Sequence, residues 1–365
     1  MKVLSIGDYS GDLGVYEAQL KQFMVMHHRG VDVTIQGHFS EEIENLLKSN
    51  NIPIIKDKPI NKNDADFIKR LKENTLKNNF NIVHVFGGSN TSNTCIALKK
   101  HKAVKIIGYM GSTSVHWHDP SAYKTYLNPR IDAMICNSDG NAIHFKKQLF
   151  GKNKRKVHRI YKGYNPDWFS NYEMNDLSDW GIKPDSIVIT SVGNRRKVKA
   201  MDLFVKAAKL VKNIKELDIH FVLVGDNTDD DYMTQIKNNS PFPENIHLLG
   251  YKSDIKEILK RTDIYVQTSL KEGLGRAITE SMCLKKPIIV TNAGGCAELV
   301  DEGVNGYIAT NKSVASIAEK INLLTVSKEK RVEFGENSFQ RILNIFNIEI
   351  TVDQTLALYH SLLKK

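Results

Sequence analysis

Short runs of β-branched and other apolar residues alternate along this chain with stretches in which apolar residues recur at helical spacing. This alternation is typical of parallel sheets that helices cover on both faces. The first set of expected strands is 3–6, 31–35, 82–86, 104–109, 133–137 and 157–161. The second set is 187–192, 219–224, 246–249, 264–267, 288–290 and 307–308. We therefore predict an α/β protein with two doubly wound, Rossmann-like sheets.

The two sets of strands are separated by residues 163–184, which contain Pro166, Pro184 and several Asn and Asp residues. We interpret this stretch as a connection between two domains, residues 1–165 and 166–349. The tail after residue 327 predicts two more helices. Two doubly wound domains that face each other leave a central cleft at the carboxyl ends of their strands, so functional residues should come directly after strands.

The composition is that of a folded globular protein, with 41% hydrophobic and 25% charged residues in 365. Its net charge of +10 is uneven, because residues 1–165 hold 25 Lys and Arg against 14 Asp and Glu. The basic residues are densest at 146–162. A basic half indicates an anionic partner, which could be a charged substrate, an acidic lipid surface or nucleic acid, or else an ordinary solvated face.

No apolar run is long enough to span a membrane, and Asp8 cuts short the first apolar segment before it could serve as a signal peptide. We therefore expect a cytoplasmic protein. The four cysteines are spread singly without a Cys-x-x-Cys pair, which argues against a zinc site and against a disulfide framework. No metal site is expected.

Two segments of the second half carry the strongest chemical signal. After the strand at 187–192, the run Gly193-Asn194-Arg195-Arg196-Lys197-Val198-Lys199 places fixed cations where a diphosphate would need them. After the strand at 264–267, Glu272 lies in a Gly273-Leu274-Gly275 turn, and Glu280 follows within a helix that begins near Gly275. One carboxylate could then meet a sugar and the other a ribose.

These two segments, together with Lys286–Val300 of the following strand and turn, resemble the retaining glycosyltransferases of family 4, also called group 1 glycosyl transferases. The resemblance covers residues 186–310 and is looser in the first half, where Gly14 and the 131–138 strand carry it. It implies the GT-B type of fold, with a nucleotide-diphosphate sugar held by the second domain and an acceptor held by the first. It also implies a metal-independent, retaining transfer of a sugar to a glycan, lipid-linked or other hydroxyl acceptor.

The resemblance assigns roles to individual residues. Glu272 would contact the transferred sugar, Glu280 the ribose hydroxyls, and Lys199 the phosphates. The family's second phosphate-binding residue, an arginine, is replaced here by Asn194, so that Arg195 or Arg196 must substitute for it. The remaining expected donor contacts are the backbone of Gly273, Leu274 and Gly275 around the phosphates or sugar, and Tyr251 and Lys252 beside the base.

In the first domain, residues 108–120 follow a strand and are expected to face the same cleft. Met110 stands where family members often have a histidine or arginine, so His116 or His118 would supply that polarity, with Asp119 orienting an imidazole. Gly14 would contribute backbone to substrate binding, and the helix at 350–365 would cross back onto this domain.

The implied process is the synthesis of cell-surface polysaccharide or glycoconjugate, with peripheral contact to the inner face of the plasma membrane. Two other classes were weighed. A nicotinamide-dependent oxidoreductase should show Gly-x-Gly-x-x-Gly after a strand, and neither half does. A nucleic-acid-binding module fits the sequence pI of 9.2, yet no recognised binding motif accompanies the charge, so no nucleic-acid partner is expected.

Overall fold

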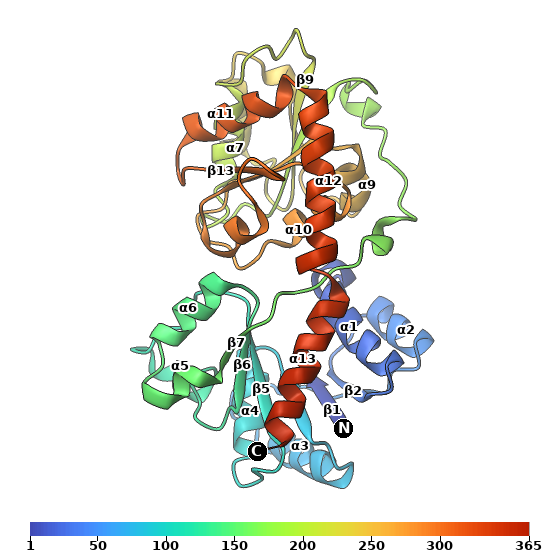
Figure 1. Ribbon diagram of the computed structural model, residues 1–365, viewed down its shortest axis with the longest axis vertical. Coiled ribbons are helices and arrows are strands. Elements are labelled where there is room, and N and C mark those ends of the chain that lie inside the picture. The colour runs from blue at the N-terminus through green and yellow to red at the C-terminus, as the bar shows by residue number, and fades with distance from the viewer. Residues whose placement is uncertain (365) are drawn as a thin grey trace. The chain divides into compact units, whose positions relative to one another are not determined.

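The computed structural model describes residues 1–364, which form two compact units (Figure 1). Unit 1 consists of Met1–Gly163 together with the C-terminal segment from Ile348, and unit 2 of Tyr164–Asn347. Both divisions lie two residues from the boundaries expected from the sequence. Each unit contains one parallel sheet with helices on both faces, which confirms the predicted α/β fold class with two doubly wound domains.

Seven parallel strands form the sheet of unit 1, in the order β3-β2-β1-β4-β5-β6-β7. They are β1 (Lys2–Ile6), β2 (Asp32–Gly37), β3 (Ile54–Lys56), β4 (Ile82–Val85), β5 (Lys105–Met110), β6 (Ala133–Cys136) and β7 (Val157–Arg159). Val3 of β1 pairs with Val33 of β2 on one side and Ile82 of β4 on the other. The strand order therefore reverses between β1 and β4, the point at which such sheets bind ligands.

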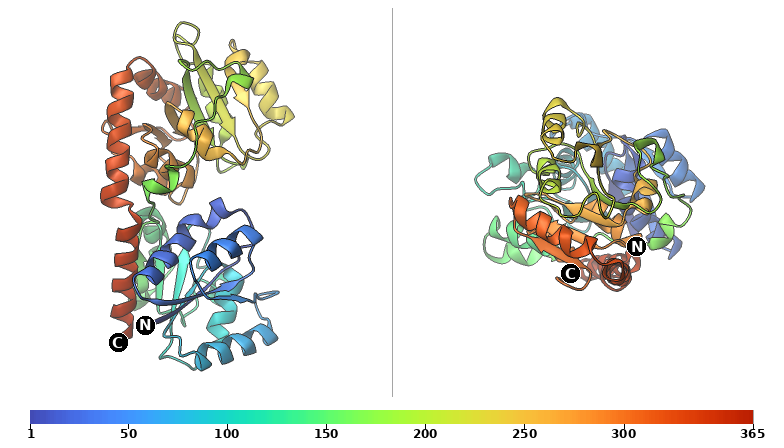
Figure 2. Two further views of the ribbon diagram at one scale, coloured as in Figure 1. Left: turned by 90° about the vertical axis from the view of Figure 1, so that its right-hand side faces the viewer. Right: turned by 90° about the horizontal axis from the view of Figure 1, so that it is seen from above.

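Two layers of helices cover the sheet of unit 1 (Figure 2). The helices are α1 (Leu13–His28), α2 (Glu41–Ser49), α3 (Ala65–Lys77), α4 (Gly88–Ala97), α5 (Pro120–Lys124), α6 (Asp139–Lys147) and α13 (Ile348–Leu363), with short 3-10 helix η1 (Gly151–Lys156). Side chains of α1, α2 and α13 share one buried cluster, and those of α3 to α6 share another. Strands between two such layers are buried on both faces, which explains their continuous apolar runs.

Unit 2 contains six parallel strands in the order β10-β9-β8-β11-β12-β13. They are β8 (Ile187–Val192), β9 (Ile219–Val224), β10 (Ile246–Leu248), β11 (Ile264–Gln267), β12 (Ile288–Thr291) and β13 (Gly306–Ala309). Its helices are α7 (Met201–Ala208), α8 (Asp231–Asn238), α9 (Ile255–Arg261), α10 (Arg276–Cys283), α11 (Val314–Thr325) and α12 (Lys328–Ile345). Short 3-10 helices occupy Pro166–Phe169, Ser178–Trp180, Pro243–Asn245 and Gly294–Leu299. The strand order reverses between β8 and β11.

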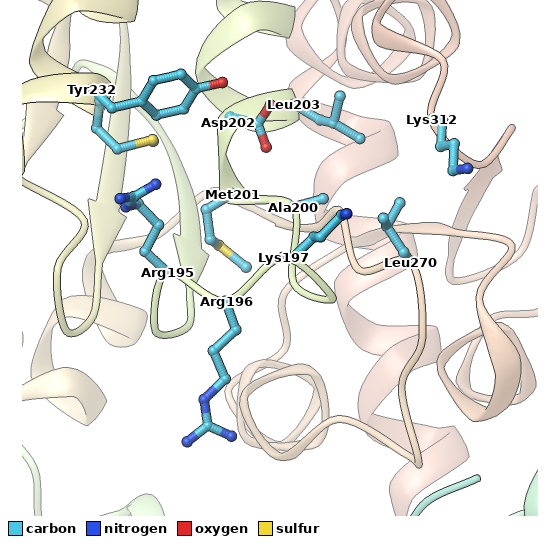
Figure 3. Close-up of a pocket in the computed structure, with 11 residues that line it drawn as sticks. Arg195, Arg196, Lys197, Ala200, Met201, Asp202, Leu203, Tyr232, Leu270 and Lys312 are labelled. Carbon is cyan, nitrogen blue, oxygen red and sulfur yellow. The ribbon is translucent and has the colours of Figure 1, made fainter. Parts of the chain in front are cut away.

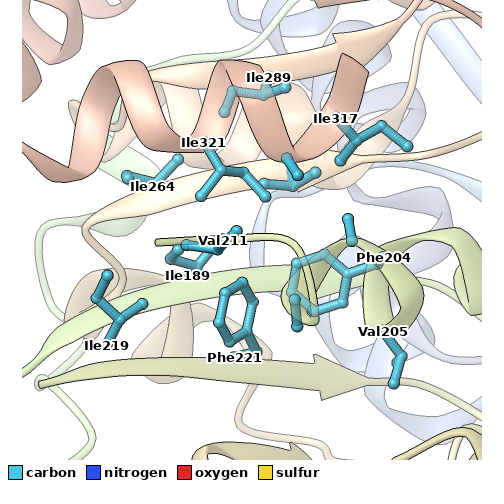
Figure 4. Close-up of a cluster of buried hydrophobic side chains, with 14 of the residues drawn as sticks. Ile189, Phe204, Val205, Val211, Ile219, Phe221, Ile264, Ile289, Ile317 and Ile321 are labelled. Atoms are coloured by element: carbon cyan, nitrogen blue, oxygen red, sulfur yellow. The ribbon is translucent and has the colours of Figure 1, made fainter. Parts of the chain in front are cut away.

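The helices of unit 2 form two separate layers. Helix α7 contacts α8 and α11, whereas α10 contacts α9 and α12. The α7 layer packs through a cluster that includes Phe204, Phe221 and Ile321, all fully buried (Figure 4). Full burial of an aromatic or branched aliphatic side chain contributes about 1.5–3 kcal/mol. The loops at the carboxyl ends of β8 and β11 therefore extend from a closely packed core of strands and helices.

The structure adds two features to the predicted fold. Strand β3 was not predicted, because three residues are too few to show a periodic pattern. Residues 163–184 begin at the division between the two units, and part of this stretch contacts α9. Asn175 donates a hydrogen bond to Asp254 (2.7 Å), and Lys260 donates to the carbonyl oxygens of Ser170 and Tyr172. Apolar side chains of this stretch, including Phe169 and Leu177, are buried.

Helix α13 packs on unit 1, as expected for residues 350–365. Its Tyr359 hydroxyl lies 2.6 Å from Nδ1 of His84, a buried residue of β4. Gln22 of α1 donates to Thr355 (3.1 Å), and Arg29 donates to Asp353 (2.6 Å). The C-terminal helix is therefore bound to unit 1 by a buried polar pair and by apolar contacts.

The buried His84 predicts a pH-dependent stability. Burial lowers the pKa of His84 from 6.5 to about 3, because the charged imidazole would lose its solvation. Below pH 6.5, His84 takes up a proton in the unfolded chain but not in the folded chain. The free energy of unfolding should therefore decrease by about 1.4 kcal/mol for each pH unit below 6.5. Urea denaturation at pH 7, 6 and 5 should show a steeper loss in the wild type than in His84→Gln. Equal slopes would contradict this assignment.

Candidate functional site

The loops that follow β8 and β11 are joined to each other at the point where the strand order of unit 2 reverses. The amide of Leu270 donates to the carbonyl oxygen of Val198 (2.7 Å), and Oγ1 of Thr268 donates to the carbonyl oxygen of Ala200 (2.9 Å). We call these segments loop 193–200 and loop 268–275. Their pairing brings the two sequence-predicted donor segments into one site.

The centre of this site is an ion pair between Lys199 and Glu272. Lys199 Nζ lies 2.5 Å from Glu272 Oε2, and the two side chains are 28% and 15% exposed. Ser269 also donates its hydroxyl to the same carboxylate oxygen, at 3.2 Å. Partial burial strengthens the attraction between the charges relative to a surface pair. The ammonium could therefore bind an anionic group of a ligand, and the carboxylate could accept a hydrogen bond from a hydroxyl group of the same ligand.

The backbone of Glu272 is held in place by the turn after β12. The amide of Gly295 donates to the Glu272 carbonyl oxygen (3.1 Å). Gly294 has φ +63°, and a Cβ atom there would stand 2.7 Å from the same oxygen. Glycine is required at this position for both reasons. The turn thus fixes where the Glu272 carboxylate points.

Glu280 lies on α10, the helix that follows the loop containing Glu272. Its side chain is buried, and Arg276, the first residue of α10, approaches it with 3.8 Å between Nε and Oε1. The Tyr265 phenol is fully buried, and its pKa is raised well above 10, mainly by desolvation, with the carboxylates of Glu272 and Glu280 adding to the shift. Glu280 is thus joined to the site through the start of α10.

Helix α10 begins after Gly275, which has φ +89° and supplies no side chain to cap the helix. The turn Gly273-Leu274-Gly275 thus leads straight into the first amide groups of α10. Free amides at a helix start attract anions through their hydrogen atoms and the helix dipole. This gives the site backbone donors beside the Lys199–Glu272 pair.

The two candidate arginines differ in their surroundings (Figure 3). Arg195 is paired with Asp230 at 2.5 Å and lies 5.4 Å from the ring centre of Tyr232. Arg196 extends away from them, and its guanidinium has no hydrogen-bonding or ionic partner within residues 1–364. Asn194 accepts a hydrogen bond from the amide of Asp226 (3.2 Å). Of these three side chains, Arg196 is the one free to bind a ligand.

The third expected donor segment follows β10. The amide of Gly225, after β9, donates to the carbonyl oxygen of Gly250 (2.8 Å). This bond places Tyr251 and Lys252 beside the loop that follows β9. Tyr251 is 63% exposed, and Lys252 Nζ lies 5.2 Å from the ring centre of Trp180. The segment is thus at the same edge of the sheet as Glu272.

The expected residues of unit 1 are arranged differently from the prediction. Gly14 lies in the first turn of α1, where its amide donates to Asp12 (2.7 Å) and is not free for a substrate. His116 and His118 are exposed and stack on each other, with ring centres 5.4 Å apart.

Asp119 is the residue directly before α5. Its carboxylate caps α5, accepting hydrogen bonds from the amide and the hydroxyl of Ser121 at 2.8 and 2.9 Å. These bonds hold the pKa of Asp119 below its usual value. The structure thus shows Asp119 capping α5, and its role in orienting His116 or His118 stays a prediction. Met110 is buried at the end of β5.

Sequence reasoning missed Ser269, Arg276 and Tyr265. Arg276 could have been found, because it is a cation at the first position of the helix between Glu272 and Glu280. The contribution of Ser269 and Tyr265 depends on side-chain packing that no spacing rule reveals. Among the residues that the structure describes, no cluster of three or more His, Cys, Asp or Glu is placed to hold a metal ion, and none of the helices is long and apolar enough to cross a bilayer.

Comparison with known proteins identifies relatives of both units. Residues 174–341 match the model of the family described as glycosyl transferases group 1. The N-acetyl-alpha-D-glucosaminyl L-malate synthase of Bacillus anthracis is 25% identical over 313 residues, which cover 82% of this chain and 80% of the relative.

Several solved structures match essentially the whole chain. A glycosyltransferase from Rickettsia africae superimposes with a TM-score of 0.85 at 20% identity, over 100% of this chain and 99% of that one. HepE of Anabaena, solved in complex with UDP, superimposes with a TM-score of 0.79 at 19% identity, over 99% and 100% of the two chains. At these identities the likeness shows the fold, which is that of GT-B glycosyltransferases.

Proposed function

We propose that this chain, which is a member of the group 1 glycosyl transferases through residues 174–341, moves a sugar from a nucleotide-diphosphate sugar to a hydroxyl acceptor with retention of configuration. One observation carries the proposal. The Lys199–Glu272 pair lies at the reversal of strand order in unit 2, beside the start of α10 and near Glu280. An ammonium, two carboxylates and free amides are the groups that a diphosphate joined to a sugar and a ribose requires.

Each group has one task in the proposed reaction. Lys199 stabilises the negative charge that grows on the departing diphosphate, together with the amides at the start of α10. Such preorganised donors commonly lower a barrier by several kcal/mol. Glu272 orients the sugar and supports its developing positive charge, and Glu280 binds the ribose hydroxyls. The acceptor hydroxyl attacks the face that the diphosphate leaves and passes its proton to an oxygen of the departing diphosphate, so no metal and no covalent intermediate is needed.

The free guanidinium of Arg196 is the best substitute for the arginine that Asn194 replaces. Arg276 is a second cation near the same phosphates. A positive charge at the start of a helix opposes the helix dipole, and a bound diphosphate would offset this cost. We therefore assign Arg196 and Arg276 to the diphosphate, whereas Arg195 stabilises loop 193–200 through Asp230.

Variants of these arginines test the assignment. Arg196→Ala and Arg276→Ala should each weaken UDP binding about tenfold, while binding of uridine, which lacks the phosphates, changes little. Arg195→Ala serves as the matched control and should leave both affinities within about twofold, since its pair is half exposed. Isothermal titration of UDP and uridine measures both. If only Arg195→Ala weakened UDP binding, Arg195 and not Arg196 or Arg276 would be the diphosphate-binding arginine.

A panel of nucleotide-diphosphate sugars tests the function itself. A donor that binds the native protein should raise its melting temperature, because binding to the folded state alone stabilises it. The structure of HepE with UDP supports starting with UDP-sugars. The donor that stabilises most is then incubated with candidate acceptors, and the anomeric configuration of the product is read by NMR. Inversion would reject retention, and failure of every donor to bind or react would reject the proposed function.

The acceptor is proposed to be a glycan or a lipid-linked glycan bound by unit 1, close to an anionic membrane. Trp117 and Phe150 are 53% and 65% exposed, their rings are in edge-to-face contact, and the basic segment 146–156 surrounds Phe150. Aromatic and basic side chains together suit the interface of an acidic bilayer.

This contact has a direct test. The wild type should sediment with vesicles containing phosphatidylglycerol, and Trp117→Ala with Phe150→Ala should reduce the bound fraction several-fold. Val332→Ala, an exposed apolar position of α12, is the control and should behave like the wild type. Absence of binding at low salt would remove membrane contact from the proposal.

A further inference from the structure

A separate pocket lies on the α7 side of the two joined loops in unit 2 (Figure 3). Its volume is about 490 Å³, and its walls come from loop 193–200, α7, α8, Leu270 and Lys312. None of Lys199, Glu272 and Glu280 lines it. Arg196, which we assign to the donor diphosphate, is also in its lining, so the pocket adjoins the proposed donor site on the side of α7 and α8.

The pocket combines an apolar floor with a positively charged rim. Met201, Leu203, Met233 and Leu270 supply apolar surface, and Tyr232, 45% exposed, supplies an aromatic ring. Lys197 and Lys312 stand on either side of Leu270 in Figure 3.

The charges on the rim are not balanced. Arg195 is paired with Asp230, and Asp202 with Lys206 at 2.7 Å. Lys197 and Lys312 have no ionic or hydrogen-bonding partner for their ammonium groups among residues 1–364. Two unpaired cations at one pocket repel each other and favour an anionic ligand.

The size of the pocket narrows the chemistry of that ligand. Organic ligands occupy pockets of roughly 300–1,000 Å³, so 490 Å³ is far more than a phosphate ion needs. The apolar floor and the Tyr232 ring suit a flat or ring-shaped group, and the lysines suit a phosphate. We propose that this pocket is a second ligand site, which takes a phosphorylated ring compound, either a nucleotide or a sugar phosphate.

The second site shares a wall with the donor site. Lys197 lines the pocket, and two residues later Lys199 pairs with Glu272. Val198 between them accepts the hydrogen bond from the Leu270 amide, and Leu270 also lines the pocket. A ligand that orders Lys197 and Leu270 would restrict the same loops that hold the donor. Any coupling of the two affinities must be reciprocal.

Binding to a variant with a disabled donor site tests the proposal. In a variant with Lys199→Ala, Glu280→Ala and Arg276→Ala, none of which lines the pocket, UDP or glucose 1-phosphate should still raise the melting temperature, and inorganic phosphate and uridine should require at least tenfold higher concentration. Adding Lys312→Ala to this variant should lower its affinity for the ligand that binds by at least fivefold. Lys328→Ala removes one exposed lysine of α12 and should change its affinity less than twofold. Binding of UDP would identify the ligand as a nucleotide, and binding of glucose 1-phosphate would identify it as a sugar phosphate.

Two results would overturn the second site. The first is that no phosphorylated compound stabilises the variant with the disabled donor site. The second is that this variant still binds a phosphorylated compound and that Lys312→Ala leaves the affinity unchanged. Should the disabled variant not fold, equilibrium dialysis of the wild type replaces it. The second bound equivalent should then disappear in Lys312→Ala, and one equivalent in both proteins refutes the site. A wild type that binds a donor at one site only would keep the proposed function and reject this inference.

Discussion

Lys199→Ala should reduce turnover at saturating donor by roughly 10²–10³-fold, the loss that follows removal of one preorganised donor from an active site. The ammonium lies 2.5 Å from Glu272 in the free protein, and in the proposed reaction it would contact the departing diphosphate. The charge on the diphosphate grows as the sugar bond breaks, so the lysine binds the transition state more strongly than the substrate. The loss should therefore appear in kcat more than in KM.

The control for Lys199→Ala is Lys271, the residue after Leu270 in loop 268–275. Lys271 precedes Glu272, is exposed, and carries the same charge, so Lys271→Ala changes the net charge of the region equally. Its turnover should stay within about twofold of the wild type. Circular dichroism and melting temperature establish that Lys199→Ala is folded. Near-normal kcat in a folded Lys199→Ala protein would reject the role of this lysine in stabilising the leaving group.

Most of the sheet architecture could be predicted because its strands are buried on both faces. Ile187–Val192 and Ile219–Val224 are mostly apolar and buried throughout, and the observed strands have the bounds expected from the sequence. Strand β3 (Ile54–Lys56) escaped prediction because it has three residues and lies at the edge of its sheet. In residues 163–184, proline and asparagine indicate an irregular backbone, but they do not show that part of it contacts α9.

The site could be predicted in part, for a similar reason. Glu272 and Lys199 follow neighbouring strands, and the parallel sheet brings the carboxyl ends of such strands together. The difference between Arg195 and Arg196 could not be predicted, because it depends on Asp230, which lies more than thirty positions away and pairs with only one of them. The capping of α5 by Asp119 likewise depends on local side-chain geometry that the spacing of residues does not reveal.

A chain that ends at Asn347 should lose the cooperative folding of unit 1. Helix α13 buries Ile348, Val352, Leu358, Tyr359 and Leu362 against this unit. Each such side chain contributes about 1.5–3 kcal/mol when buried, and together they approach the whole stability of a domain, about 5–15 kcal/mol. Unit 2 keeps all of its own residues. Limited proteolysis with mass spectrometry should therefore show digestion of residues 1–163 and survival of a fragment that contains residues 164–347.

A point variant separates the packing of α13 from the general effect of truncation. Tyr359→Phe keeps the ring but leaves Nδ1 of His84 without its partner, and Nε2 of that imidazole is already without one within the described residues. The free energy of unfolding should fall by about 1–3 kcal/mol. Gln354→Ala, an exposed position of α13, should change it by less than about 0.5 kcal/mol. If the truncated chain resists protease in residues 1–163 and Tyr359→Phe unfolds like the wild type, α13 does not stabilise unit 1.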